Sequence, residues 1–192
     1  MNKTAVITGA TSGIGAEFAR RLVQRGYDLL ITGRRMDVIK KAAQKLSDEY
    51  GVSVEVIKAE LSDGKDLDRL IRHIKKLDSV EFLVNNAGFG TNDYFWNVSI
   101  EEQEWMVAVH VTAAMKLVHA ALPAMIQRGR GFIINLSSLG SFLPLKVNAV
   151  YGGSKAFLNI FSESLQMELA DTGIRVQAQC PGFNQNGFPR QN

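Results

Sequence analysis

Several features that would place the chain in a specialised class are scarce. A single cysteine, Cys180, excludes an internal disulfide framework and fits a reducing compartment. No run of 18 apolar residues is free of charges, so the sequence predicts no transmembrane helix. The opening MNKTAVITGA lacks the long apolar core of a secretory signal. We therefore expect a cytoplasmic protein without membrane association.

The excess of positive over negative charge is also small. The net charge is only +3, and lysines and arginines are scattered among acids along the chain. No basic stripe typical of nucleic-acid binding is present, so no nucleic-acid partner is expected. No metal site is expected either. Proline is rare, with 4 residues in 192, and no linker or repeat interrupts the sequence. The length suits one domain with a sizeable core.

Short apolar runs alternate with longer helix-like segments. The runs are rich in Val, Ile, Leu and Phe with little polar alternation, as in strands that are covered on both faces. This pattern predicts an α/β domain with a parallel sheet between helices. Expected strands are 4–9, 28–33, 52–59, 81–86, 131–137 and 174–180; expected helices are 13–25, 36–50, 63–77, 99–128 with a break, and 151–171. Cys180, at the end of the last strand, is expected to be a buried, inert thiol.

A glycine-rich turn, TGATSGIG (8–15), joins the first strand to the first helix. Gly9 permits a tight turn, Gly13 allows close approach of a pyrophosphate, and Gly15 allows close helix–sheet packing. The helix N-terminus offers N–H groups and partial positive charge to a phosphate. A turn without a ligand, or one for another phosphate ligand such as a mononucleotide, would look similar. The expected cofactor-binding residues here are Gly9, Thr11, Ser12, Gly13, Ile14 and Gly15.

The second strand ends in ITGRRMD, where NAD-binding domains usually place an acid for the ribose 2′-hydroxyl. Here Arg34 and Arg35 take that region. A guanidinium binds a 2′-phosphate through paired hydrogen bonds, so the sequence favours NADP(H) over NAD(H), with Arg34 as the better candidate. Alternatively, both arginines are solvated loop residues.

Together, TGATSGIG, NNAG (85–88) and YGGSK (151–155) resemble the short-chain dehydrogenase/reductase family, NADP-preferring type, over essentially the whole chain. The resemblance implies a Rossmann-type doubly wound sheet in three α/β/α layers, lacking the usual last helix and strand. It also implies hydride transfer between NADP(H) and a carbonyl or secondary alcohol, and a homodimer or homotetramer. Residues 1–183 would form the dinucleotide-binding domain, and 184–192 a polar tail or the start of a substrate loop.

The resemblance also implies roles for individual residues. Tyr151 would be the general acid and base, and Lys155, on the same helix face, would lower its pKa from about 10. Ser138, 13 residues before Tyr151, would stabilise the charge that develops on the substrate oxygen. Besides Tyr151 and Lys155, the positions that match cofactor contacts are Leu61, Asn86, Ala87, Gly88, Pro181 and Gly182.

The chain departs from the family pattern at a few positions. His110 stands where many members have an asparagine that supports the lysine through water, and it is either a relay or a packed core histidine. Glu60 replaces a common aspartate. The chain stops soon after Pro181-Gly182, so either a C-terminal part is missing or the substrate pocket lacks a wall. A non-catalytic NADP-binding protein is therefore the alternative function.

Overall fold

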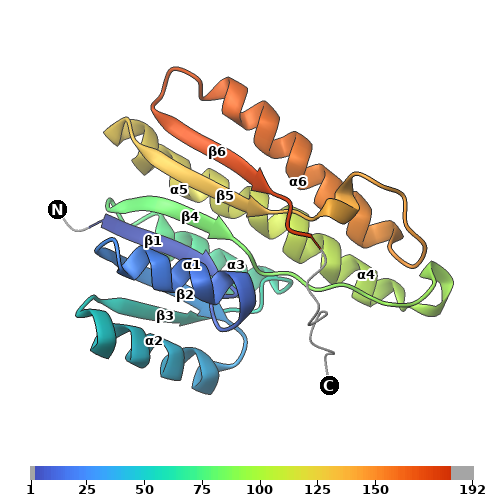
Figure 1. Ribbon diagram of the computed structural model, residues 1–192, viewed down its shortest axis with the longest axis horizontal. Helices are drawn as coiled ribbons and strands as arrows, with labels where there is room; N and C mark the ends of the chain where they lie inside the picture. Colours follow the sequence, from blue (N-terminus) through green and yellow to red (C-terminus); the bar gives the residue numbers. More distant parts are fainter. Residues whose placement is uncertain (1–2, 183–192) are drawn as a thin grey trace.

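The computed structural model describes residues 3–182 and centres on one six-stranded sheet (Figure 1). The strand order is β3-β2-β1-β4-β5-β6, and every neighbouring pair is parallel. This arrangement confirms the predicted doubly wound α/β fold. The strands are β1 (Lys3–Thr8), β2 (Tyr27–Gly33), β3 (Val54–Lys58), β4 (Val80–Asn85), β5 (Gly131–Leu136) and β6 (Ile174–Gln179).

Helices cover both faces of the sheet (Figure 1). One face carries α1 (Gly13–Val23) and α2 (Met36–Tyr50). The other carries α3 (Gly64–Ile74), α6 (Ala149–Glu168) and a long helical stretch. That stretch comprises α4 (Ile100–Val107), a π-helical segment η2 (Ala108–Ala113) and α5 (Ala114–Arg128). Two short 3-10 turns, η1 (Phe95–Asn97) and η3 (Leu139–Ser141), lie in loops.

The absence of polar alternation in the inner strands β1, β2, β4 and β5 follows from the two covered faces, whereas the edge strand β6 alternates buried and exposed residues. In β1, Val6 packs into the core beside α3 and α5, whereas Ile7 packs into the core beside α1 and α2. Both side chains are fully buried. Successive strand residues point to opposite faces, so a strand between two helical layers must be apolar at nearly every position.

The sheet topology determines where a site can form. From β1 the strand order runs one way to β2 and β3, and from β4 it runs the other way to β5 and β6. Open α/β sheets bind ligands beyond the carboxyl ends of the strands where the order reverses. Here that point lies between β1 and β4, so the glycine-rich turn and the NNAG segment are neighbours.

The stretch Ile100–Arg128 is long and apolar enough to cross a membrane, although no such span was expected. Half of its most apolar window is buried inside the protein, and α5 packs against β4 and β5. A core helix of a globular domain meets the same criteria. The length and composition of this helix therefore do not indicate a membrane segment.

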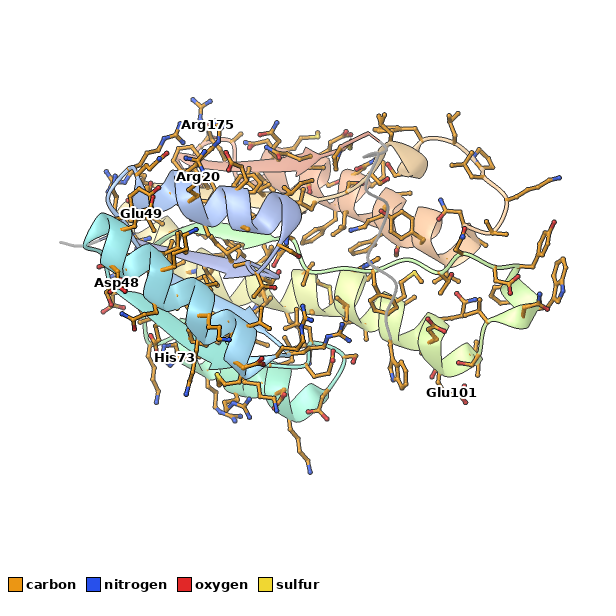
Figure 2. The ribbon with its side chains drawn as sticks, turned by 60° about the horizontal axis from the view of Figure 1, so that its bottom comes forward. Arg20, Asp48, Glu49, His73, Glu101 and Arg175 are labelled. Atoms are coloured by element: carbon orange, nitrogen blue, oxygen red, sulfur yellow. The ribbon has the colours of Figure 1, made fainter. Side chains whose placement is uncertain are left out.

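The charged side chains of α1 and α2 lie on the outer surfaces of these helices. Figure 2 shows Arg20, Asp48 and Glu49 on the exposed side of α1 and α2, and Glu101 at the distant end of α4. Arg20 and its neighbour Arg21 both pair with Glu17. Acids and bases alternate on this surface, in agreement with the scattered charges of the sequence.

Candidate active site

The glycine-rich turn has the conformation that its sequence predicts. Gly9 and Gly13 have positive φ angles of 67° and 55°, which glycine adopts with little strain. No atom lies within 4 Å of the position that a Cβ at Gly13 would take, so the backbone there is open to a ligand. The side chain of Ser12 does not cap α1, and no acid lies in its first turn. By contrast, Asp63 and Ser99 cap α3 and α4. The start of α1 can therefore accept an anion.

The turn is held against the NNAG segment by direct contacts. The amide of Asn86 donates to the carbonyls of Thr8 (3.0 Å) and Gly9 (2.9 Å). The hydroxyl of Thr8 accepts from the backbone N–H groups of Asn86 and Ala87, each at 3.0 Å. A Cβ at Gly15 would collide with the Asn86 amide and the Gly9 carbonyl. Close helix–sheet packing at Gly15, as the sequence predicted, thus has a specific cause.

Helix α6 and turn η3 bring together the three residues expected to be catalytic. Tyr151 and Lys155 lie one helical turn apart at the start of α6, and both are buried. The side chains of Ser138 and Tyr151 form a hydrogen bond. Ser138 also accepts from the N–H of Gly140 (3.1 Å) and so caps η3. The Nζ atom of Lys155 lies 5.7 Å from the ring centroid of Tyr151.

The pKa of Tyr151 differs from the sequence-based expectation. We expected Lys155 to lower it. Instead, burial raises the pKa of Tyr151 above 10.0, and the hydrogen bond from Ser138 opposes this only in part. Burial also lowers the pKa of Lys155 from 10.5 to about 8. The Lys155 ammonium donates to the carbonyl of Leu136 (2.6 Å), so its nearest bonded partner is β5 rather than the phenol.

Arg34 lies at the carboxyl end of β2, as predicted, and is exposed. Its guanidinium faces Glu60 across 3.7 Å, so the acid that follows β3 partly balances its charge. Leu61 is 7% exposed and belongs to the core, which leaves little of its side chain for an adenine. Pro181 lies beside the serine turn, because its carbonyl accepts from the N–H of Leu139 (3.1 Å). The chain after Gly182, including the predicted tail 184–192, lies outside the described residues.

One further expectation needs correction. Cys180 is half-buried rather than buried, and its Sγ atom lies 3.4 Å from the Asn159 amide oxygen. The two glycines after Tyr151 differ in their surroundings. At Gly152 a Cβ would meet the Gly140 carbonyl at 3.3 Å, whereas Gly153 faces open space.

Sequence reasoning missed several hydroxyl groups that hold the site together. Thr8 joins the glycine-rich turn to NNAG, Ser137 donates to the carbonyl of Lys155 (2.8 Å), and Ser154 donates to the carbonyl of Tyr151 (2.8 Å). Ser137 and Ser154 are buried. Each stands next to a residue that the motifs singled out. These hydroxyl residues could have been found in the sequence by their position, next to a motif residue at the end of a strand or the start of a helix.

Exposed apolar side chains occur in the two loops that follow Ser138 and NNAG. Leu139, Phe142, Leu143 and Leu145 follow Ser138 and are 42–65% exposed. In the loop after NNAG, Tyr94 and Trp96 stack with ring centroids 4.7 Å apart, and Trp96 is 76% exposed. Within residues 3–182, no group of three or more His, Cys, Asp or Glu side chains is placed to hold a metal ion. The two loops therefore expose apolar surface.

Comparisons with known proteins agree with this geometry. The short chain dehydrogenase family profile matches residues 3–188. Hydroxysteroid dehydrogenase-like protein 1 of Gallus gallus is 36% identical over 180 residues, which cover 92% of this chain and 54% of the relative. Inactive hydroxysteroid dehydrogenase-like protein 1 of Homo sapiens is 36% identical over 182 residues, which cover 93% and 55%. The chain thus spans about half the length of these relatives.

A solved structure shows the same fold. The short-chain dehydrogenase from Sphingobium yanoikuyae in complex with NADPH has a TM-score of 0.92 and 36% identity, and the match covers 95% of this chain and 72% of that one. The fold, the motifs and the family profile agree along the sequence. The chain therefore belongs to the short-chain dehydrogenase family.

Proposed function

We propose that the protein is an NADPH-dependent oxidoreductase that reduces a carbonyl compound to a secondary alcohol. The observation that carries the proposal is that an anion site and the three candidate catalytic residues lie at the same edge of the sheet. The uncapped, acid-free start of α1 offers an anion site there, and Ser138, Tyr151 and Lys155 converge at the same edge. The exposed Arg34 supplies positive charge for a 2′-phosphate, and the complex of the Sphingobium relative with NADPH supports this choice.

The residues present fit the cofactor, since an open backbone at Gly13 and a helix start without a side-chain cap suit a pyrophosphate. Bound NADPH would supply the hydride for the carbonyl carbon. Gly9, Thr11, Ser12, Gly13, Ile14 and Gly15 would hold its phosphates, and Asn86, Ala87, Gly88, Leu61, Pro181 and Gly182 would border it.

The protein's own residues would handle the proton. Tyr151 donates its phenolic proton to the substrate oxygen, and Ser138 donates a hydrogen bond to the same atom. The two hydroxyls already bond each other, so they are close enough to share one oxygen. Because burial raises the pKa of Tyr151, the phenol stays protonated near neutral pH, as an acid must. The nearby Lys155 ammonium then stabilises the tyrosinate that remains. This protonation state favours reduction over oxidation.

The substrate we propose is a bulky, apolar carbonyl compound, in line with the exposed Phe142 and Leu143 in the loop after Ser138 and the exposed Trp96 in the loop after NNAG. We further propose that residues 1–183 act as one domain in a cytoplasmic homodimer or homotetramer. The exposed apolar side chains of Trp105, Val107 and Met115 on the long helix support self-association. Light scattering of the purified protein measures the oligomer directly.

Tyr151→Phe tests the mechanism. We expect turnover to fall by about 100-fold or more, with NADPH affinity changed less than about twofold, because only the proton donor is lost. Tyr50→Phe, at the end of α2, is the matched control and should retain turnover. Undiminished turnover in Tyr151→Phe would contradict the assigned role.

A non-catalytic dinucleotide-binding protein is the second candidate. The observation in its favour is that the human relative, which is 36% identical, is named inactive. NADPH binding without turnover on a broad panel of ketones and aldehydes would select this candidate. Displacement of NADPH by a mononucleotide would instead indicate another phosphate ligand.

A further inference from the structure

His110 is a buried, titratable residue that the proposed mechanism does not use. It is 1% exposed and lies in the π-helical segment Ala108–Ala113, between α4 and α5. π turns inside α-helices are rare overall, and those that occur often lie at functional sites. The contacts of the His110 ring therefore bear on the site.

Both ring nitrogens of His110 are hydrogen-bonded. The backbone N–H of Phe89 donates to Nε2 (3.1 Å), and Nδ1 lies 2.8 Å from the hydroxyl of Ser154. A backbone amide can only donate, so Nε2 must carry a lone pair and the ring proton must reside on Nδ1. Nδ1–H then donates to Ser154, whose hydroxyl donates to the carbonyl of Tyr151 (2.8 Å). Every group in this chain has one defined role.

The surroundings of the ring agree with a neutral imidazole. Burial and the charge of Lys155 both lower the pKa of His110 well below 6.5. A Cβ at Gly88 would lie 2.6 Å from Nε2 and 3.4 Å from the Lys155 Nζ atom, so the loop, the ring and the ammonium nearly touch. The ring also makes edge contacts with Phe89 and Tyr151, with centroids 6.0 and 5.7 Å apart.

We propose that His110 is a positioning residue that fastens the Gly88–Phe89 loop to the Tyr151–Lys155 turn through a fixed Nδ1–H tautomer. The proposal rests on the proposed function for its kinetic consequences. In such a role His110 is no proton carrier, because accepting a proton at Nε2 would break its bond from Phe89. The loop that borders the proposed cofactor site and the helix that bears the acid are thereby held at one distance.

The tautomer can be measured directly. The three histidines are His73, His119 and His110, and long-range 1H–15N correlation spectra report the protonation of each ring nitrogen. From about pH 5.5 to about pH 9 we expect the His110 ring to stay neutral with its proton on Nδ1. The exposed His119 and the half-exposed His73 serve as internal controls. A proton on Nε2, or titration of His110 within this range, would overturn the proposal.

Variants test whether the link positions Tyr151. A glutamine amide oxygen can replace Nε2 as acceptor for Phe89, and an asparagine amide can replace Nδ1 as donor to Ser154. We expect His110→Leu to lower turnover about tenfold or more, because a small displacement of an acid is costly. His110→Asn and His110→Gln should each recover part of it. The shape of the pH profile of turnover should not change.

Coupling between the two ends of the link distinguishes positioning from simple stabilisation. Ser154→Ala should lower turnover in the native background. In the His110→Gln background it should lower turnover little further, because that variant has already lost the hydrogen bond to Ser154. Ser162→Ala, a buried serine of the same helix that bonds Asn135 (2.8 Å), is the matched control and should add equally in both backgrounds. Folded His110 variants with turnover within about twofold of the native protein, or a shifted pH profile, would overturn the proposal. If no turnover is found at all, the tautomer measurement still decides it.

Discussion

Burial of the Lys155 ammonium should give the free energy of unfolding a specific pH dependence. Burial lowers its pKa from 10.5 to about 8, a difference of about 2.5 units. Each unit corresponds to about 1.4 kcal/mol, so the folded protein disfavours the charged form by about 3 kcal/mol. This penalty is fully present well below pH 8, where the ammonium is charged in both states. Between the two pKa values the folded state binds fewer protons than the unfolded state, so stability rises with pH.

Lys155→Met removes this dependence, since methionine does not titrate. From about pH 7 to about pH 9.5, the native protein should gain about 2 kcal/mol of stability relative to Lys155→Met. Urea denaturation followed by circular dichroism at both pH values measures this difference, and other titrating groups cancel in the comparison. The exposed Lys146→Met serves as the control and should parallel the native protein. Equal pH dependence in native and Lys155→Met proteins would refute the argument that burial lowers the pKa of Lys155.

Three other predictions concern the cofactor site. Gly15→Ala should lower the free energy of unfolding by about 1–3 kcal/mol in thermal or urea denaturation, because the new Cβ collides with the Asn86 amide. Arg34→Ala should weaken NADPH binding about tenfold in fluorescence titrations and leave NADH binding within about twofold, because only NADPH carries the 2′-phosphate; equal losses for both nucleotides would contradict this role. The ratio kcat/KM for NADPH reports the free enzyme and should fall as pH rises through about 8, where Lys155 loses its charge. A rise with pH would contradict that assignment.

The sequence predicts the fold well because the inner strands β1, β2, β4 and β5 are buried on both faces and leave a clear apolar signal. The edge strands β3 and β6 are only partly buried. The six predicted strands differ from the observed ones by at most two residues at either end. The roles of Gly9 and Gly13 could be predicted too, since their positive φ angles belong to the local turn. Close packing at Gly15 could also be predicted, but not that its partner is the distant Asn86. Tyr151 and Lys155 share a helix face for the same local reason.

What the sequence does not reveal depends on contacts between distant segments. The pKa of Tyr151 reflects burial. The short motif from Tyr151 to Lys155 does not indicate how deeply the phenol is buried. The link from Phe89 through His110 to Ser154 joins residues 21 and 44 positions apart. The π-helical register of Ala108–Ala113 has no composition signal that we could identify. Such features follow from how the elements pack, not from their own residues.

The π-helical segment has a consequence for insertions and deletions in the chain. A π turn accommodates more residues than an α turn, so deleting one residue between Ala108 and Ala113 could restore continuous α-helical hydrogen bonds. Such a deletion would rotate one end of the long helix relative to the other by about 100°. The helix would be more regular, yet the face that holds His110 and the face of α5 that packs on the sheet could no longer both be in place. A deletion that makes the helix more regular should therefore be tolerated poorly between Ala108 and Ala113. The surface loops at either end of the long helix should tolerate a one-residue deletion.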